Sequence, residues 1–149
     1  MNEFELTVND VLIDTFNIIL KYEEVSLGKI TDVAVTISEA HMIDAIGRQA
    51  GKVPVSKIAE HLNITMPTAS AAIKKLEHKG LVQKDPCAAD GRRALVSLTA
   101  EGLRVGEAHW TFHERMVKSI TSQLVDSEQD VLLVALGKLN EFFKTKLEA

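Results

Sequence analysis

The sequence predicts a mainly α-helical fold with a small β-hairpin wing, a winged helix-turn-helix of six helices. Three features support this prediction. A short helix, a tight turn and a longer helix follow one another within residues 56–80. Two short apolar runs then flank a loop that carries two arginines. Apolar helical segments lie on both sides of this region, toward the two ends of the chain.

The first helical pattern covers residues 8–25. Its apolar residues occupy more than one face, so we expect burial on several sides, against the core of the chain or against a second subunit. Residues 27–37 have little periodicity and are predicted to form a loop. Ser38 and Glu39 are predicted to open a second helix.

The helix-turn-helix itself is predicted between residues 56 and 80. A weak strand at residues 53–55 precedes it, and Ser56 is expected to cap a short helix over residues 57–62. Residues 63–65 form the turn. In this arrangement the first helix supports the second, and the second enters the major groove of DNA.

The second of these helices has clear start and stop signals. Thr65 is a good N-cap residue, Pro67 suits a first helical turn, and Gly80 suits the position after the last turn. One face carries an apolar stripe of Ala69, Ala72, Ile73 and Leu76. The opposite face is small, hydroxylic and basic, which suits contact with DNA.

A hairpin with an arginine-bearing tip is predicted next. Residues 81–84 and 94–98 have strand character, and the residues between them include Pro, Asp and Gly, which turn the chain. Such a tip fits the minor groove, whose negative potential attracts guanidinium groups. Residues 65–93 carry a net charge of +3 in a chain of net charge −4, which indicates a local site for a polyanion.

Two further helices are predicted after the hairpin. Thr99 caps one that runs to about Leu124, and Ser127 opens the last. We therefore expect residues 1–149 to form a single regulator-like chain, in which residues 38–99 bind DNA. Residues 4–30 and 100–149 are expected to form a homodimer that presents two reading helices to two half-sites.

Composition limits the alternatives. Hydrophobic content of 46%, one cysteine and the lack of a long apolar run or a secretory signal predict a soluble cytoplasmic protein that has no membrane partner. No phosphate-binding loop, nucleophile elbow or paired carboxylates are recognisable, so we expect no enzyme, no catalytic residues, no cofactor and no metal. A helical protein-interaction module is the alternative outside DNA binding, but it leaves the arginine-bearing hairpin unexplained.

Two motifs resemble the MarR family of bacterial transcription regulators. Residues 90–102 match its wing motif, D-x-R followed by an apolar strand and L-T-x-x-G, and residues 76–82 match its L-E-x-K-G-[LY]-[VI]. The resemblance covers nearly the whole chain and implies a dimeric DNA-binding regulator. The expected DNA contacts are Thr65, Thr68, Ser70, Ala71, Lys74, Lys75, Asp90, Arg92 and Arg93.

Within these contacts Arg92 is expected to enter the minor groove while Asp90 holds its side chain, with Arg93 as the fallback. Ala71 stands where many family members carry a large basic residue. Base recognition is therefore expected to depend on hydroxyl and methyl contacts and on the wing.

A finer resemblance concerns the fatty-acid-biosynthesis repressors of Gram-positive bacteria, the FabT type. It implies a repressor of fatty-acid-synthesis genes whose corepressor is acyl carrier protein bearing a long acyl chain. The alternative is a sensor that releases DNA on binding phenolic or drug-like molecules. The matching residues are Phe16, Asn17, Leu20, residues 23–25, Leu27, Ile37, Glu39, His41, Ile43, Asp44, Ile46, Gly47, His109, Phe112, His113 and Met116.

A ligand pocket is expected between the dimerising helices and the reading domain, but it has the weakest signal in the sequence. Its candidate lining, equally plausible as ordinary core, is Phe16, Ile19, Leu20, Ile43, Ile46, Trp110, Phe112 and His113. His109 and His113 have a spacing that can bind zinc, but packing or hydrogen bonding is favoured for them. Cys87 in the hairpin is expected to be a passive thiol rather than a redox sensor.

Overall fold

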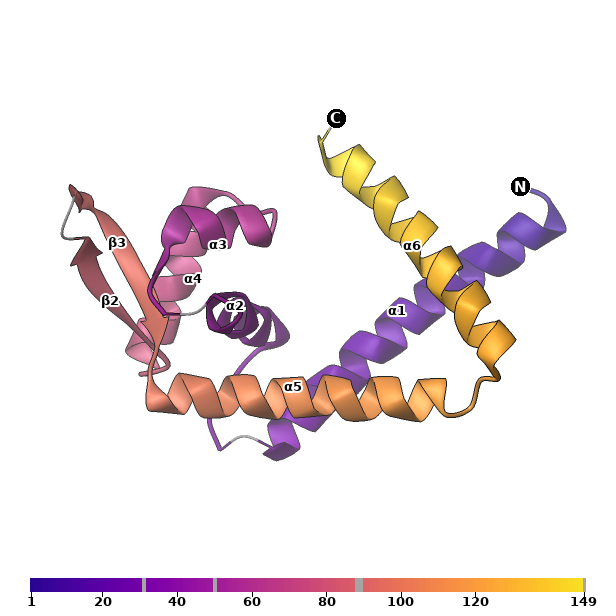
Figure 1. Cartoon of the computed structure of the whole chain (residues 1–149), viewed down its shortest axis with the longest axis horizontal. Helices are drawn as coiled ribbons and strands as arrows, with labels where there is room; N and C mark the ends of the chain where they lie inside the picture. The colour runs from indigo at the N-terminus through magenta and orange to yellow at the C-terminus, as the bar shows by residue number, and fades with distance from the viewer. Residues whose placement is uncertain (31, 50, 88–89, 149) are drawn as a thin grey trace. The chain divides into compact units, whose positions relative to one another are not determined.

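The computed structural model of the chain describes residues 1–30, 32–49, 51–87 and 90–148, which form six helices and a three-stranded sheet (Figure 1). The chain divides into two compact units, Met1–Phe112 and His113–Ala149. In chain order the elements are α1 (Glu3–Ile30), α2 (Ile37–Gly47), β1 (Val53–Pro54), α3 (Val55–His61), α4 (Met66–His78), β2 (Val82–Cys87), β3 (Asp90–Leu98), α5 (Ala100–Thr121) and α6 (Asp126–Glu148).

Helix α1 is longer than the sequence predicts. The prediction of a loop from residue 27 is wrong at its start, because the helix continues through Gly28 to Ile30. Leu27 is only 1% exposed, and its burial holds the last turn of the helix against the core. Gly28 has helical geometry, so it does not end the helix as a glycine with a positive φ would.

Helix α2 begins at Ile37, slightly before Ser38 and Glu39, the residues predicted to open it. Thr36 is the N-cap, and its hydroxyl accepts a hydrogen bond from the Glu39 backbone N–H. The Glu39 carboxylate accepts one from the Thr36 backbone N–H at 2.9 Å, which completes a capping box. The predicted cap of α3 by Ser56 is wrong, because Pro54 precedes that helix and Ser56 lies within its first turn.

Helix α4 confirms the predicted signals. Thr65 accepts a hydrogen bond from the Thr68 backbone N–H, and Gly80, with φ of +72°, follows the C-cap residue. Ala69, Ile73 and Leu76 are fully buried. They join a core cluster with apolar residues of α2, α3, α5 and the sheet, so the stripe fixes which face of α4 points inward.

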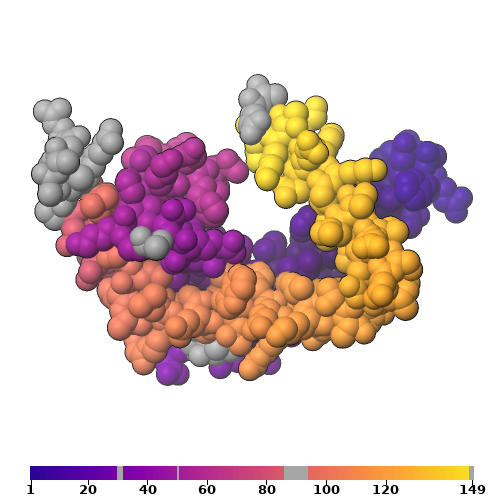
Figure 2. Space-filling view, viewed as in Figure 1, coloured from indigo at the N-terminus to yellow at the C-terminus, as the bar shows by residue number. Residues whose placement is uncertain are grey.

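The sheet has the order β1-β3-β2 and is antiparallel throughout. The weak strand predicted at residues 53–55 is present as β1 over Val53–Pro54, in which Val53 pairs with Val96 of β3, whereas Val55 begins α3. Strands β2 and β3 extend further toward the hairpin tip than the apolar runs predict, with an irregularity between Pro86 and Cys87. Figure 2 shows helices α2 to α4 in purple and magenta packed as one body beside the salmon end of β3.

The second unit contains the C-terminal part of α5, from His113 onward, and the whole of α6. Its apolar side chains are largely exposed within the single chain, including Leu133 at 73% and Phe142 at 54%. The described helices include none that is long and apolar enough to span a membrane.

Candidate nucleic-acid interface

The outer face of α4 carries the contacts predicted on the reading helix. Because the apolar stripe points into the core, the residues between its members point outward. The side chains on this outer face are all exposed, and they are those of Thr65, Thr68, Ser70, Ala71, Lys74 and Lys75.

The start of α4 is organised by two threonines. Their hydroxyl oxygens are 2.8 Å apart, and Thr65 also accepts the Thr68 backbone N–H. Thr65 is therefore engaged in capping, whereas Thr68, one turn into the helix, has a hydroxyl held at the exposed surface. This geometry favours Thr68 over Thr65 as a partner for a base edge.

Fewer lysines contribute exposed positive charge to this surface than the sequence count suggests. Lys79 Nζ lies 2.7 Å from the Glu39 carboxylate and 2.8 Å from the Ala34 carbonyl oxygen. Lys84 Nζ lies 3.4 Å from Glu77. Both lysines are engaged within the protein, so the exposed positive charge on α4 rests on Lys74 and Lys75.

Glu39 ties the end of α4 to the start of α2. Burial raises the pKa of its carboxyl, but hydrogen bonds from Lys79 and from the Thr36 backbone outweigh burial and hold the pKa below its usual range. The carboxylate is thus charged at neutral pH and serves both as the capping partner and as the anchor of Lys79. Sequence reasoning missed this anchor because its partners are 40 residues apart.

The wing is present as the β2–β3 hairpin, and Arg92 and Arg93 belong to β3 by their backbone. The side chains of Asp90, Arg92, Arg93 and Cys87 lie outside the part of the chain whose side chains are described. Their predicted roles therefore remain proposals.

The structure brings only some of the residues predicted to line the ligand pocket together. A hollow of about 510 Å³ in the first unit brings Ile43 and Trp110 together with Leu98, Leu103 and Gly106. Phe16 and Leu20 are exposed on α1, while Ile46 and Phe112 are buried core residues that do not line this hollow. Ile19 does not line it either, and His113 belongs to the second unit.

The rim of this hollow is polar. Asp44, Arg48, Glu107 and Thr111 belong to it, and Arg48 donates a 2.7 Å hydrogen bond to Asp44. Asp44, three residues after His41, thus pairs with Arg48. His41 instead contacts Glu23 of α1.

A supported reading helix with an exposed polar face, followed by a β-hairpin, defines a winged helix-turn-helix DNA-binding protein. Residues 35–93 match a family model described as "MarR family". Streptococcus pneumoniae FabT, solved in complex with DNA, is 30% identical, with 95% of this chain and 98% of that chain covered and a TM-score of 0.90.

Two more relatives agree. MepR of S. aureus in complex with DNA is 25% identical, with 89% of this chain and 96% of that chain covered and a TM-score of 0.74. The transcriptional regulator ZitR of Lactococcus lactis is 27% identical over 125 residues, which are 81% of this chain and 85% of that protein. The chain belongs to the MarR family, whose members are DNA-binding transcription regulators and not enzymes.

Replacing either exposed lysine of α4 should weaken the salt dependence of DNA binding. We expect Lys74→Ala and Lys75→Ala each to reduce the slope of log K against log salt by about 0.9, because one phosphate contact releases about one counterion. Fluorescence anisotropy at several salt concentrations measures the slope. Lys21→Ala removes the same charge from α1 and should leave the slope unchanged; an unaltered slope in both α4 variants would contradict the predicted contacts.

Proposed function

We propose that this chain is a homodimeric repressor of fatty-acid-synthesis genes, with acyl carrier protein bearing a long acyl chain as corepressor. The observation that carries the proposal is the match to S. pneumoniae FabT, which extends over 98% of that protein at 30% identity. The residues of the first, second and fifth helices that resemble the FabT type add to it.

Exposed apolar surface supports the dimer. Within the first unit, α1 exposes large apolar side chains along its length, from Phe4 at 76% to Phe16 at 57%. Within the second unit, α6 does the same with Leu133, Phe142 and Phe143. Monomeric proteins rarely expose so many large apolar residues on single helices, so these faces are expected to be covered by a second copy.

A two-fold dimer explains how DNA would be read. Each copy would offer the outer face of α4 to the major groove and its wing to the neighbouring minor groove. The two half-sites would lie about one helical turn, roughly 34 Å, apart. The operator would then be a palindrome, because the protein symmetry requires the same sequence in both half-sites.

The corepressor is tested by the sign of its effect. We expect long-chain acylated carrier protein to raise the affinity of the full-length protein for a promoter fragment that precedes fatty-acid-synthesis genes. Anisotropy titrations with the acylated carrier and with the unacylated carrier as control provide the measurement. An unchanged or lowered affinity would contradict the corepressor role while leaving DNA binding intact.

The second candidate function is a small-molecule sensor that releases DNA. The hollow beside Ile43 and Trp110 favours it, because an apolar floor with a charged rim suits an aromatic acid or a drug-like amphiphile. Such a ligand would lower operator affinity, so the same titration separates the two functions.

A further inference from the structure

The middle of the outer face of α4 is apolar. Ala71 lies on the side of the helix opposite the buried stripe of Ala69, Ile73 and Leu76, and its side chain is exposed. Because alanine ends at its Cβ methyl group, the backbone of α4 can approach the floor of a groove more closely here than a long side chain would allow. A methyl group is neither a donor nor an acceptor, so it cannot pair with the polar edge of a base.

A hollow of about 800 Å³ lies beside Ala71, between α4 and the start of α2. Thr68 and Lys75, which are exposed and belong to the predicted DNA contacts, also line it, so the hollow is continuous with the outer face of α4. Its apolar lining consists of Met42, Leu62, Ile64, Pro67, Ala71 and Ala72. An apolar group of a bound duplex would therefore meet methyl and methylene groups on this side of the reading helix.

Thr68 adds a second methyl group next to Ala71. The two residues are three apart on α4, so their side chains are neighbours on the helix surface. The hydroxyl oxygen of Thr68 lies 2.8 Å from that of Thr65, which also accepts the Thr68 backbone N–H. These contacts fix the rotamer of Thr68 and hence the place of its methyl group. Thr68 and Ala71 together form a small, ordered apolar patch at the mouth of the hollow.

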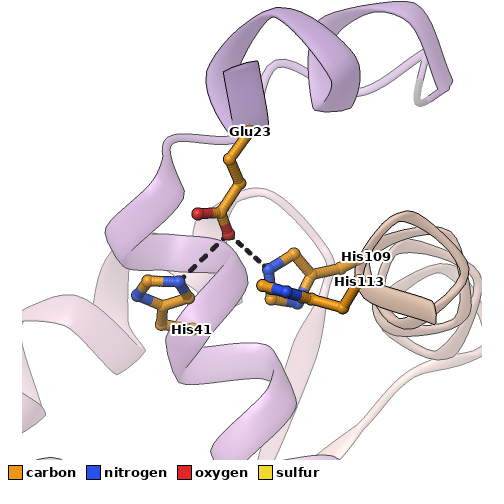
Figure 3. Close-up of side chains that lie close together, drawn as sticks. All are labelled: Glu23, His41, His109 and His113. Atoms are coloured by element: carbon orange, nitrogen blue, oxygen red, sulfur yellow. Dashed lines mark hydrogen bonds and ion pairs between the residues drawn. The ribbon is translucent and has the colours of Figure 1, made fainter. Parts of the chain in front are cut away.

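The wall of the hollow that faces α4 is held by polar contacts. His41 of α2 lines this wall, and its Nε2 lies 3.1 Å from Oε1 of Glu23 on α1 (Figure 3). The same Oε1 lies 2.6 Å from Nε2 of His109 on α5, and Glu23 is only 2% exposed. Glu39, in the same wall, holds Lys79 at the end of α4. These contacts connect α2 to its neighbours, so we expect the hollow to keep its shape when α4 contacts DNA.

Thymine is the base that matches this apolar patch. In the major groove only thymine presents a methyl group, whereas the corresponding edge of cytosine presents an amino donor. A polar edge pressed against the patch would lose water without gaining a hydrogen bond, which is costly. We propose that Ala71 and Thr68 contact the methyl group of one thymine in each operator half-site and make thymine the preferred base there. This inference rests on the proposed binding of α4 in the major groove.

Deoxyuridine lacks only the methyl group of thymidine, so it tests the contact directly. An operator is first selected from random duplexes with the full-length protein. Its thymines are then replaced by deoxyuridine, one symmetry-related pair at a time, and affinity is measured by fluorescence anisotropy. We expect one pair to lower the affinity of the parent by about 15-fold, because each of the two lost methyl contacts costs a factor of about 4.

Ala71→Ser assigns the contact to Ala71. Serine adds a hydroxyl at an exposed position, so the fold should stay intact, and the ratio of thymine to uracil affinity at that pair should fall at least about 3-fold. Ala100→Ser makes the same change at an exposed position of α5 and should keep the parent's ratio. Lys74→Ala should weaken binding to both duplexes alike, because a phosphate contact does not sense the methyl group.

Two outcomes would overturn the inference while leaving operator binding in place. One is a parent protein that binds every uracil-containing duplex as tightly as the thymine duplex. The other is an unchanged ratio in folded Ala71→Ser, which would assign the methyl contact to another residue. If the parent selects no sequence from the random duplexes, the proposed binding of α4 in the major groove fails first, and the thymine contact fails with it.

Discussion

Gly102→Ala should destabilise the protein by about 3 kcal/mol or more, one of the larger effects a single methyl group can have. A Cβ at this position would overlap the backbone carbonyl oxygen of Leu81 and lie 3.0 Å from its carbonyl carbon. Neither atom can move freely, because the same oxygen accepts the Thr99 backbone N–H at 3.1 Å. The overlap can be relieved only by separating the start of α5 from the end of the α4–β2 turn.

This contact also explains the L-T-x-x-G motif in physical terms. Thr99 donates its hydroxyl to the Gly80 carbonyl oxygen at 2.7 Å and accepts the Gly102 backbone N–H at 3.1 Å. Threonine thus caps α5 and fastens it to the turn, while glycine allows the two backbones to approach closely. The motif sets where the wing begins relative to α4.

Thermal unfolding followed by circular dichroism measures the effect. For a chain of this length the loss corresponds to a fall in Tm of about 6–12 °C. Gly28→Ala is the matched control, because a Cβ there meets no atom within 4 Å and alanine favours the helix. The control should be as stable as the parent or more stable. Equal Tm values for Gly102→Ala and the parent would mean that α5 does not approach Leu81 this closely.

The helix-turn-helix could be predicted because its signals are local. The Thr65 cap, the apolar stripe of α4 and the glycine after it act within one or two turns, and all are present in the structure. Errors came where tertiary packing overrides local preference. Gly28 remains helical because the neighbouring Leu27 is buried, and Ser56 does not cap α3 because Pro54 already begins that turn.

The buried polar cluster could not be predicted in the same way. His41 and His109 are 18 and 86 residues from Glu23, and no periodicity links them. The only local signal was the spacing of His109 and His113, which by itself fits ordinary packing as well. Similarly, the charge count of the reading region included Lys79 and Lys84, whose carboxylate partners appear only once the fold brings them together.

Arg92→Ala should weaken operator binding by about 1–3 kcal/mol, a factor of roughly 5–150, while the protein stays folded. The reasons are its place on β3 of the wing and the match of residues 90–92 to the family's D-x-R motif. With Lys79 and Lys84 held by carboxylates, the wing arginines would supply much of the remaining positive charge near the DNA. The control Arg115→Ala removes the same charge from the second unit and should bind operator as the parent does.

Arg92→Lys distinguishes a minor-groove contact from a simple phosphate contact. Lysine keeps the charge but is more strongly hydrated than arginine, so it enters a narrow groove less favourably. For a minor-groove arginine, Arg92→Lys should retain the parent's salt slope yet lose several-fold in affinity. If Arg92→Lys binds as well as the parent while Arg92→Ala does not, the contact is to phosphate. If both variants bind as the parent does, Arg92 has no part in DNA recognition, and Arg93 becomes the arginine to test.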